Sequence, residues 1–266
     1  MKVIYAFKEY YKPHYKPIDD NFFKLARLSV ELAKKFYKTE FYCDSSSKIL
    51  FEANGVFFDE VIVLDEIENY TGSITSMGKI YAMMAQTEPY MMLDLDTLIF
   101  QKMPEVYTIG FAYPEIVRLH LNTLIDEPRP TAYLDYLDRF YKEPLDNHRH
   151  KFPDWFIVHP DSSANNSVVM VRHPFLVKAI YEEILSKFTF KDLDDIGAMF
   201  IEQFLLYFYL KNHNIDVGYF AENRIDPQTI NYELVMHKFI HMMNYHEDPK
   251  LNDKIEYIAN LYNIKL

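Results

Sequence analysis

The chain has 266 residues, with 28 Lys and Arg against 39 Asp and Glu, so its formal net charge is −11. A chain this acidic, without a dense run of Lys and Arg, is unlike a protein whose main partner is nucleic acid. Its single Cys, Cys43, excludes an intrachain disulfide and a cysteine-rich zinc site. With 49% hydrophobic and 25% charged residues, the composition is typical of a globular protein with one large domain or two small ones.

The amino terminus reaches charged residues within a few positions and lacks the apolar stretch of a signal peptide. The most apolar run elsewhere, residues 204–210, has seven residues, far fewer than the roughly 20 that cross a bilayer. The sequence therefore predicts a soluble, cytoplasmic protein without a transmembrane segment.

Short apolar runs alternate with stretches of helical spacing through the first half of the chain. The runs predict strands at 3–7, 41–43, 61–64, 90–93, 98–100 and 109–113. The helical spacing predicts helices at 22–36, 48–54 and 73–86. Strands that alternate with helices favour an α/β fold with a mostly parallel sheet covered on both faces.

The second half begins with an irregular, Pro-rich and aromatic stretch at 128–160, which contains Trp155 and the pair His148 and His150. Long irregular segments in compact domains are often functional, so this stretch could form a lid over an acceptor, although a solvated loop explains its His residues as well. Beyond it, the pattern predicts a strand at 167–171, helices at 174–187 and 194–211, a strand at 233–242 and a terminal helix from about 250.

The sequence Leu93-Asp94-Leu95-Asp96-Thr97 places two carboxylates at the end of an apolar run. Side chains two positions apart on a strand point to the same face, so Asp94 and Asp96 are expected to project together. Two adjacent carboxylates repel each other unless a cation lies between them, and a hard divalent ion prefers oxygen ligands. The carboxyl ends of parallel strands are also where open α/β sheets bind ligands. A solvated pair of turn acids is the simpler alternative for an isolated Asp-x-Asp.

Several segments together resemble GT-A-fold glycosyltransferases, loosely of the glycogenin and lipopolysaccharide-galactosyltransferase type. The similarity runs from Lys79-Ile80-Tyr81-Ala82 through Gln86 and Pro89 into the Asp94-Leu95-Asp96 motif. Further along, Asn165-Asn166-Ser167 precedes an aliphatic strand, with Ser where that group usually has Gly, and Glu202-Gln203 resembles its Asp-Gln pair. His237 or His241 resembles its late metal-binding His, whereas the usual Lys-Pro-Trp ending is absent.

The resemblance implies a single GT-A domain over residues 1–266, with a mixed, mostly parallel sheet, a nucleotide-binding half at 1–113 and an acceptor-binding half at 114–266. It implies a metal-dependent hexosyltransferase that moves a sugar from a nucleotide-sugar donor, UDP-linked by analogy, to a glycan, lipid or protein acceptor. The cofactor would be Mn²⁺ or Mg²⁺ bound by Asp94, Asp96 and His241. Donor contacts would come from Tyr5, Ala6, Asp44, Lys79, Asp94, Leu95, Asp96, Asn165 and Asn166, and catalytic contacts from Glu202, Gln203 and Asp195.

Single-residue alternatives stay open. His237 and His246 compete with His241 for the metal, and Lys79 could be an ordinary exposed helix residue rather than a phosphate contact. Gln203 lies on the apolar stripe of its expected helix, where a buried structural amide is as good an explanation as a sugar contact. If the reaction inverts the anomeric centre, a base is needed, for which Asp161, Asp195 and Glu202 are candidates.

Two rival functions remain. The Asp94-x-Asp96 motif also resembles the nucleophile loop of haloacid-dehalogenase-like phosphatases, with Asp94 as the nucleophile. That family has a Gly after the second Asp and usually places the motif after its first strand, whereas here Thr97 follows and three strands are expected upstream. The other rival is a non-catalytic sugar-binding protein on a GT-A shell, against which the intact Asp pair counts.

Overall fold

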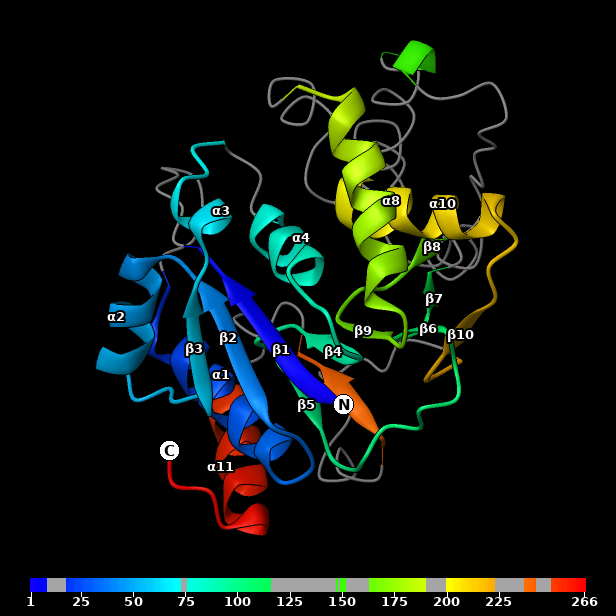
Figure 1. Cartoon of the computed structure of the whole chain (residues 1–266). Helices are drawn as coiled ribbons and strands as arrows, with labels where there is room; N and C mark the ends of the chain where they lie inside the picture. Colours follow the sequence, from blue (N-terminus) through cyan, green and yellow to red (C-terminus); the bar gives the residue numbers. More distant parts are fainter. Residues whose placement is uncertain are drawn as a thin grey trace, which may run out of the picture.

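The central feature of the computed structural model is a seven-stranded sheet with strand order β10-β6-β9-β4-β1-β2-β3 (Figure 1). The structure describes residues 1–8, 18–72, 76–115, 147, 149–151, 163–189, 200–222, 237–242 and 250–266. The strands of this sheet are β1 (Lys2–Phe7), β2 (Thr39–Cys43), β3 (Glu60–Val63), β4 (Tyr90–Leu93), β6 (Ile109–Phe111), β9 (Val168–Val171) and β10 (Val217–Tyr219).

The sheet is mixed and mostly parallel. Strand β1 pairs in parallel with β2 and β4, β2 pairs in parallel with β3, and β10 pairs in parallel with β6. Strand β9 runs antiparallel to both β4 and β6, with Leu93 opposite Val168. The carboxyl ends of β1 to β4 and the segment that leads into β9 therefore meet at one edge of the sheet. The α/β class with a mixed, mostly parallel sheet flanked by helices, predicted from the sequence, is confirmed.

Helices cover both faces of the sheet (Figure 1). One face packs against α4 (Met77–Met84), α8 (Pro174–Lys187) and α10 (Leu206–Asn212), and the other against α1 (Asp20–Lys34) and α2 (Ser45–Ala53). Every residue of β4 is buried, as expected for a strand covered on both sides. Its continuous apolar sequence is the reason why the strand could be predicted.

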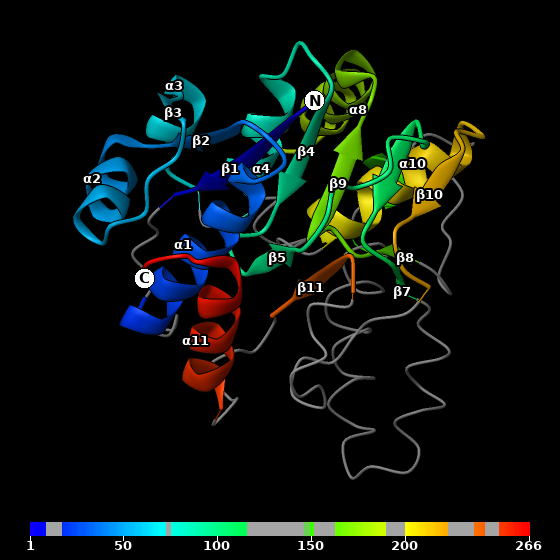
Figure 2. The same cartoon turned by 90° about the horizontal axis from the view of Figure 1, so that it is seen from below.

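A second, two-stranded sheet pairs β5 (Thr97–Ile99) with β11 (Phe239–His241) in antiparallel register. Figure 2 shows this pair beside α1 and α11 (Leu251–Tyr262). Leucines of α1 and isoleucines of α11 bury their side chains with Leu98 and Ile240 in one cluster. This packing fixes β11 next to the segment that follows β4.

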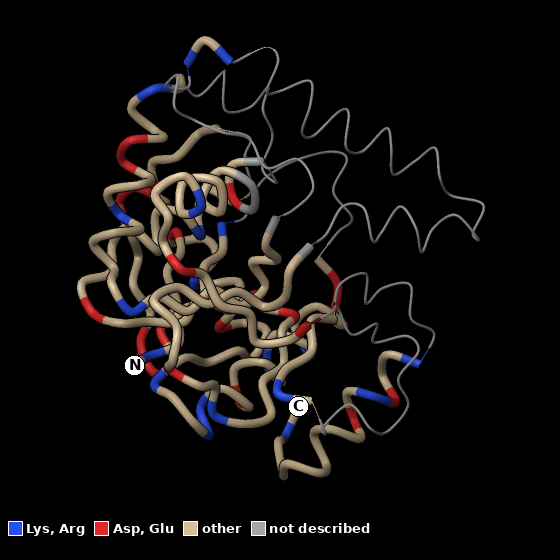
Figure 3. Tube along the Cα trace, turned by 90° about the vertical axis from the view of Figure 1, so that its right-hand side faces the viewer, with Lys and Arg blue, Asp and Glu red and all other residues tan. Residues whose placement is uncertain are grey.

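The remaining described elements are short. They are α3 (Asp65–Glu68), the antiparallel pair β7 (Pro114–Glu115) and β8 (Ser163–Ala164), the 3₁₀ turn Arg149–Lys151, and a π-helix at Phe200–Leu205 that continues directly into α10. Among the described residues, no helix combines the length and the apolar character that a bilayer-spanning segment needs. Acidic and basic residues are interspersed along the described trace (Figure 3).

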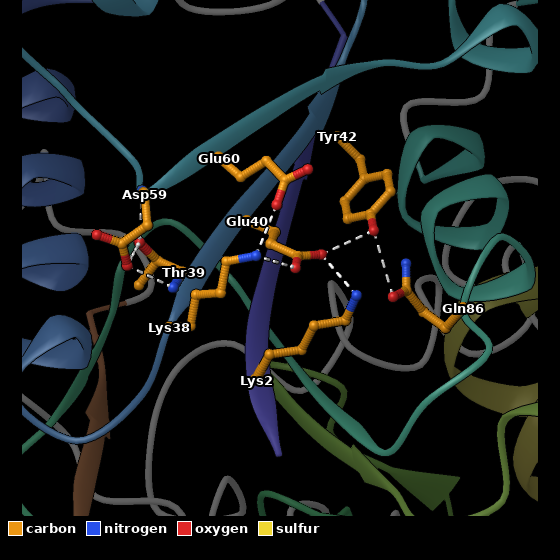
Figure 4. Close-up of polar contacts among 8 residues, drawn as sticks. All are labelled: Lys2, Lys38, Thr39, Glu40, Tyr42, Asp59, Glu60 and Gln86. Atoms are coloured by element: carbon orange, nitrogen blue, oxygen red, sulfur yellow. Dashed lines mark hydrogen bonds and ion pairs between the residues drawn. The ribbon is translucent and has the colours of Figure 1, made fainter.

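Polar contacts hold the amino ends of the parallel strands together (Figure 4). The buried Glu40 carboxylate accepts hydrogen bonds from Lys2 Nζ at 2.6 Å, Lys38 Nζ at 3.1 Å and the Tyr42 hydroxyl at 2.9 Å. Nearby, Asp59 Oδ2 accepts from the Thr39 backbone amide at 2.8 Å. This polar cluster lies at the opposite edge of the sheet from the carboxyl end of β4.

Most predicted elements of the described residues are present, with ends shifted by a few positions. The helix expected at 73–86 is α4 from Met77, and residues 73–75 lie outside the described residues. The helix expected at 194–211 is described only from residue 200, where it begins as a π-helix. The strand expected at 233–242 is described as β11 alone, and most of the stretch at 128–160 also lies outside the described residues. The sheet draws strands from both proposed halves of the chain, 1–113 and 114–266.

Candidate metal centre at the carboxyl edge of the sheet

Asp94 and Asp96 lie in a tight turn that joins β4 to β5. The Asp94 amide donates to the Ser167 carbonyl at 3.0 Å, and the Thr97 amide donates back to the Asp94 carbonyl at 3.0 Å. Strand β4 ends at Leu93, so the turn, rather than alternation along a strand, brings the two carboxylates to one side. The expectation that both side chains project together is met by a different local geometry.

His241 reaches the same place from β11. In the β5–β11 register His241 lies opposite Thr97, and the Met242 amide donates to the Asp96 carbonyl at 2.9 Å. The His241 side chain is 9% exposed. Backbone pairing of β5 with β11 is therefore sufficient to hold this imidazole beside the turn, and no metal is needed for it.

The three side chains converge. His241 Nε2 lies 3.3 Å from Asp96 Oδ1 and 3.8 Å from Asp94 Oδ2, and one ligand atom from each residue falls within 4.8 Å of the others. Two ligands at right angles around a Mg²⁺ ion, each about 2.1 Å away, are about 3 Å apart, near the 3.3 Å between Asp96 Oδ1 and His241 Nε2. Two carboxylates and an imidazole could together hold a divalent metal ion, and its identity as Mn²⁺ or Mg²⁺ stays a prediction.

Without an ion, the imidazole and the carboxylates pair with each other. Burial opposes ionisation of Asp96, but the adjacent His241 outweighs it and lowers the pKa of Asp96. Burial likewise opposes the charged form of His241, and Asp96 and Asp94 outweigh it and raise the pKa of His241. His241 Nδ1 is buried and has no hydrogen-bond partner among the described residues. A divalent ion would replace the proton between these groups.

Lys79 and Glu202 lie against the same turn. Lys79 Nζ, from α4, forms ion pairs with Asp94 Oδ1 and with Glu202 Oε1, the latter from the π-helix. The side chains of Lys79 and Glu202 are each 15% exposed. Burial opposes the charge on Lys79, but the two carboxylates outweigh it and raise its pKa. Lys79 is thus a partly buried, doubly paired ammonium and not an ordinary exposed helix residue.

Glu202 is held in place through its backbone. The Asn166 side-chain amide donates to the Glu202 carbonyl, which lies in the π-helix Phe200–Leu205. Such π-helical turns are found frequently at functional sites. Burial raises the pKa of Glu202 in spite of the neighbouring Lys79. The buried Ser167 Oγ and Asn166 Oδ1 have no hydrogen-bond partner among the described residues.

Other residues expected at the donor site have structural partners. The Tyr5 hydroxyl is buried and contacts Ser29 Oγ at 3.2 Å. The Asp44 carboxylate caps α2 by accepting from the Ser47 amide at 3.1 Å. Asn165 Oδ1 accepts from the Ser167 amide at 3.0 Å. Their role in donor binding stays a prediction, as does that of the half-buried Ala6 and the buried Leu95.

The structure bears differently on the remaining candidates. His241, and not the described His237, belongs to the convergent group, since β11 begins only at Phe239. The candidates Asp161, Asp195 and His246 lie outside the described residues, as does the side chain of Gln203. The contact between Lys79 and Glu202 was missed by sequence reasoning, because no local pattern links α4 to the π-helix.

Comparison of the chain with models of known protein families and with curated protein sequences gave no significant match.

Proposed function

We propose that this protein is a GT-A-fold glycosyltransferase that transfers a sugar from a nucleotide-diphosphate donor, UDP-linked by analogy, with the aid of Mn²⁺ or Mg²⁺. The convergence of Asp94, Asp96 and His241 at the carboxyl end of β4 is the observation that carries this proposal. Open α/β sheets bind ligands at this edge, and an Asp-x-Asp turn with a third ligand from a distant strand is a means of binding a cation there.

Glycosyl transfer from such a donor leaves negative charge on a diphosphate while the anomeric carbon gains positive charge. A bound divalent ion would act as a Lewis acid that accepts charge from the diphosphate oxygens. The chain supplies the rest of the environment. Asp94, Asp96 and His241 would hold the cation, and Lys79 offers an ammonium beside Asp94 for a phosphate oxygen. Glu202 offers a carboxylate within reach of the same ammonium, suited to sugar hydroxyls or to a developing positive charge.

The contacts of Asp94 favour this function over the phosphatase alternative. Its Oδ1 is paired with Lys79, and its Oδ2 faces His241 at 3.8 Å. A nucleophilic carboxylate must present one oxygen to phosphorus, whereas a metal-binding carboxylate can keep a cationic partner on its second oxygen. Asp94 Oδ1 thus keeps a cationic partner, and Oδ2 faces the position where a metal ion would bind.

A thermal-shift assay with UDP tests the proposal. We expect UDP to raise the melting temperature in the presence of Mn²⁺, and we expect the shift to disappear with EDTA or in Asp96→Ala. Asp65→Ala, which removes an exposed acid in α3, is the matched control and keeps the shift. If no nucleoside diphosphate stabilises the protein with Mn²⁺, the proposal is wrong. Release of phosphate from a generic phosphomonoester, lost in Asp94→Asn, would favour the phosphatase instead.

A further inference from the structure

Lys79 connects the candidate cation site to Glu202. Its ammonium contacts Asp94 Oδ1 on one side and Glu202 Oε1 on the other, and all three side chains are at most 22% exposed. Asp94 presents its second oxygen to His241 and the cation position. One carboxylate is therefore shared between an internal cation, Lys79, and the place where an external cation would bind.

The charges of these side chains are unequal. Asp94, Asp96 and Glu202 carry three negative charges and Lys79 one positive charge, so the formal sum is −2 when His241 is neutral, as a metal ligand must be. Lys79 repels a divalent ion beside Asp94, and Glu202 counteracts that repulsion by drawing the ammonium toward itself. The partly buried position reduces screening by solvent, so each charge has a measurable effect on a nearby ion.

We propose that Lys79 and Glu202 form a partner switch that sets the cation affinity of this site. In the ligand-free protein, the Lys79 ammonium forms ion pairs with both Asp94 and Glu202. Its positive charge weakens the binding of a divalent ion that carries no phosphate. A phosphate group beside the cation gives Lys79 a third partner, so that Lys79 favours the binding of phosphate together with the ion. In setting the cation affinity, Glu202 is a positioning residue that acts through Lys79, whatever contact it makes with the sugar. This inference rests on the proposed function, because it concerns the same cation and the same phosphate.

A charge series measured with Mn²⁺ alone tests the switch. The free Mn²⁺ signal in electron paramagnetic resonance gives the dissociation constant directly and requires no catalytic activity. We expect Lys79→Met to tighten Mn²⁺ binding on the order of tenfold, because it removes a repelling charge. Glu202→Gln is expected to weaken Mn²⁺ binding several-fold. Lys79 then has Asp94 as its one carboxylate partner in this cluster, so its ammonium competes more strongly with the ion for Asp94. The double variant is expected to bind Mn²⁺ about as tightly as Lys79→Met, because Glu202 acts through Lys79, whereas a return to the wild-type affinity would mean that the two charges act independently.

The opposite signs separate a switch from a structural role, since damage to the fold would weaken binding in both single variants. Lys79→Arg and Glu202→Asp keep the charges and are expected to stay near the wild-type affinity. Lys38→Met and Glu60→Gln remove one charge each from an exposed pair at the opposite sheet edge and control for net charge. In a second measurement, with saturating Mn²⁺, inorganic pyrophosphate is expected to bind Lys79→Met at least several-fold more weakly.

The outcomes distinguish this inference from the function on which it rests. If the wild type binds no Mn²⁺, both fail. If the wild type binds Mn²⁺ but Lys79→Met does not bind it more tightly, or Glu202→Gln does not bind it more weakly, the switch is overturned and the cation site stands. Unchanged pyrophosphate affinity in Lys79→Met would overturn the role of phosphate as the third partner.

Discussion

Asp96 and His241 belong to opposite halves of the chain, yet Asp96 Oδ1 and His241 Nε2 lie 3.3 Å apart. Two backbone features produce this contact, the turn after β4 and the antiparallel pairing of β5 with β11. The Met242 amide donates to the Asp96 carbonyl, so the main chains are joined as well as the side chains. The candidate metal centre is therefore built into the fold and does not depend on a single mobile side chain.

Removal of the imidazole is expected to weaken the site without destroying the fold. His241→Ala leaves two carboxylates as ligands. Loss of a residue that only supports a metal ligand lowers metal affinity on the order of tenfold to a hundredfold, and we expect Mn²⁺ affinity to fall by at least this factor when a ligand itself is removed. His237→Ala, four residues earlier and outside the convergent group, is the matched control. Isothermal titration with Mn²⁺ measures both; equal losses in the two variants would assign no special role to His241.

The polar cluster around Glu40 predicts a specific dependence of stability on pH. Burial opposes the ionised form of Glu40, but hydrogen bonds from Lys2, Tyr42 and Lys38 outweigh it and lower its pKa. A carboxyl group with a lowered folded pKa stabilises the protein above its unfolded pKa, about 4.3, and that contribution is lost as the pH falls through the folded pKa. Glu40→Gln should therefore lower the melting temperature at pH 7 and approach the wild type in acid.

The matched control for this pH experiment is Glu60→Gln. Glu60 pairs with the same Lys38, but its side chain is 51% exposed against 6% for that of Glu40. Exposed ion pairs contribute little, so we expect a much smaller loss at pH 7. A loss in Glu40→Gln that grows on acidification would contradict the assignment of a charged Glu40.

Tyr90 offers a test of core packing. Its ring is fully buried in the sheet core, and its hydroxyl has no hydrogen-bond partner among the described residues. Because an unsatisfied buried hydroxyl costs free energy, Tyr90→Phe should leave the free energy of unfolding unchanged or raise it by up to about 1 kcal/mol. Denaturant unfolding measures the difference, with Tyr42→Phe as the contrast, since the Tyr42 hydroxyl donates to Glu40 and its loss should destabilise. Clear destabilisation in Tyr90→Phe would show that its hydroxyl is hydrogen-bonded.

Strand positions could be predicted from the sequence because buried parallel strands have continuous apolar runs, as β4 shows. The direction of β9 could not be predicted, since an apolar run is the same read in either direction. Asp94 and Asp96 could be selected because two carboxylates held together between apolar runs repel each other unless a cation lies between them. The choice of His241 over His237 depends on the pairing of β5 with β11, which is a long-range contact.

Contacts across the fold account for the rest. Lys79 and Glu202 meet through the packing of α4 near the π-helix, and nothing near either residue in the sequence indicates the other. Asp44 shows the reverse case. A carboxylate after a strand and before a Ser-rich segment predicts an N-cap as readily as a donor contact, and the cap is the role seen in the structure.

The central claim is that Asp94, Asp96 and His241 bind a divalent cation, and a Mn²⁺ titration followed by electron paramagnetic resonance tests it most directly. The account predicts saturable binding of Mn²⁺ to the wild type, abolished in Asp96→Ala and retained in the control Asp65→Ala. Absence of saturable binding in the wild type, or equal binding in Asp96→Ala, would contradict it.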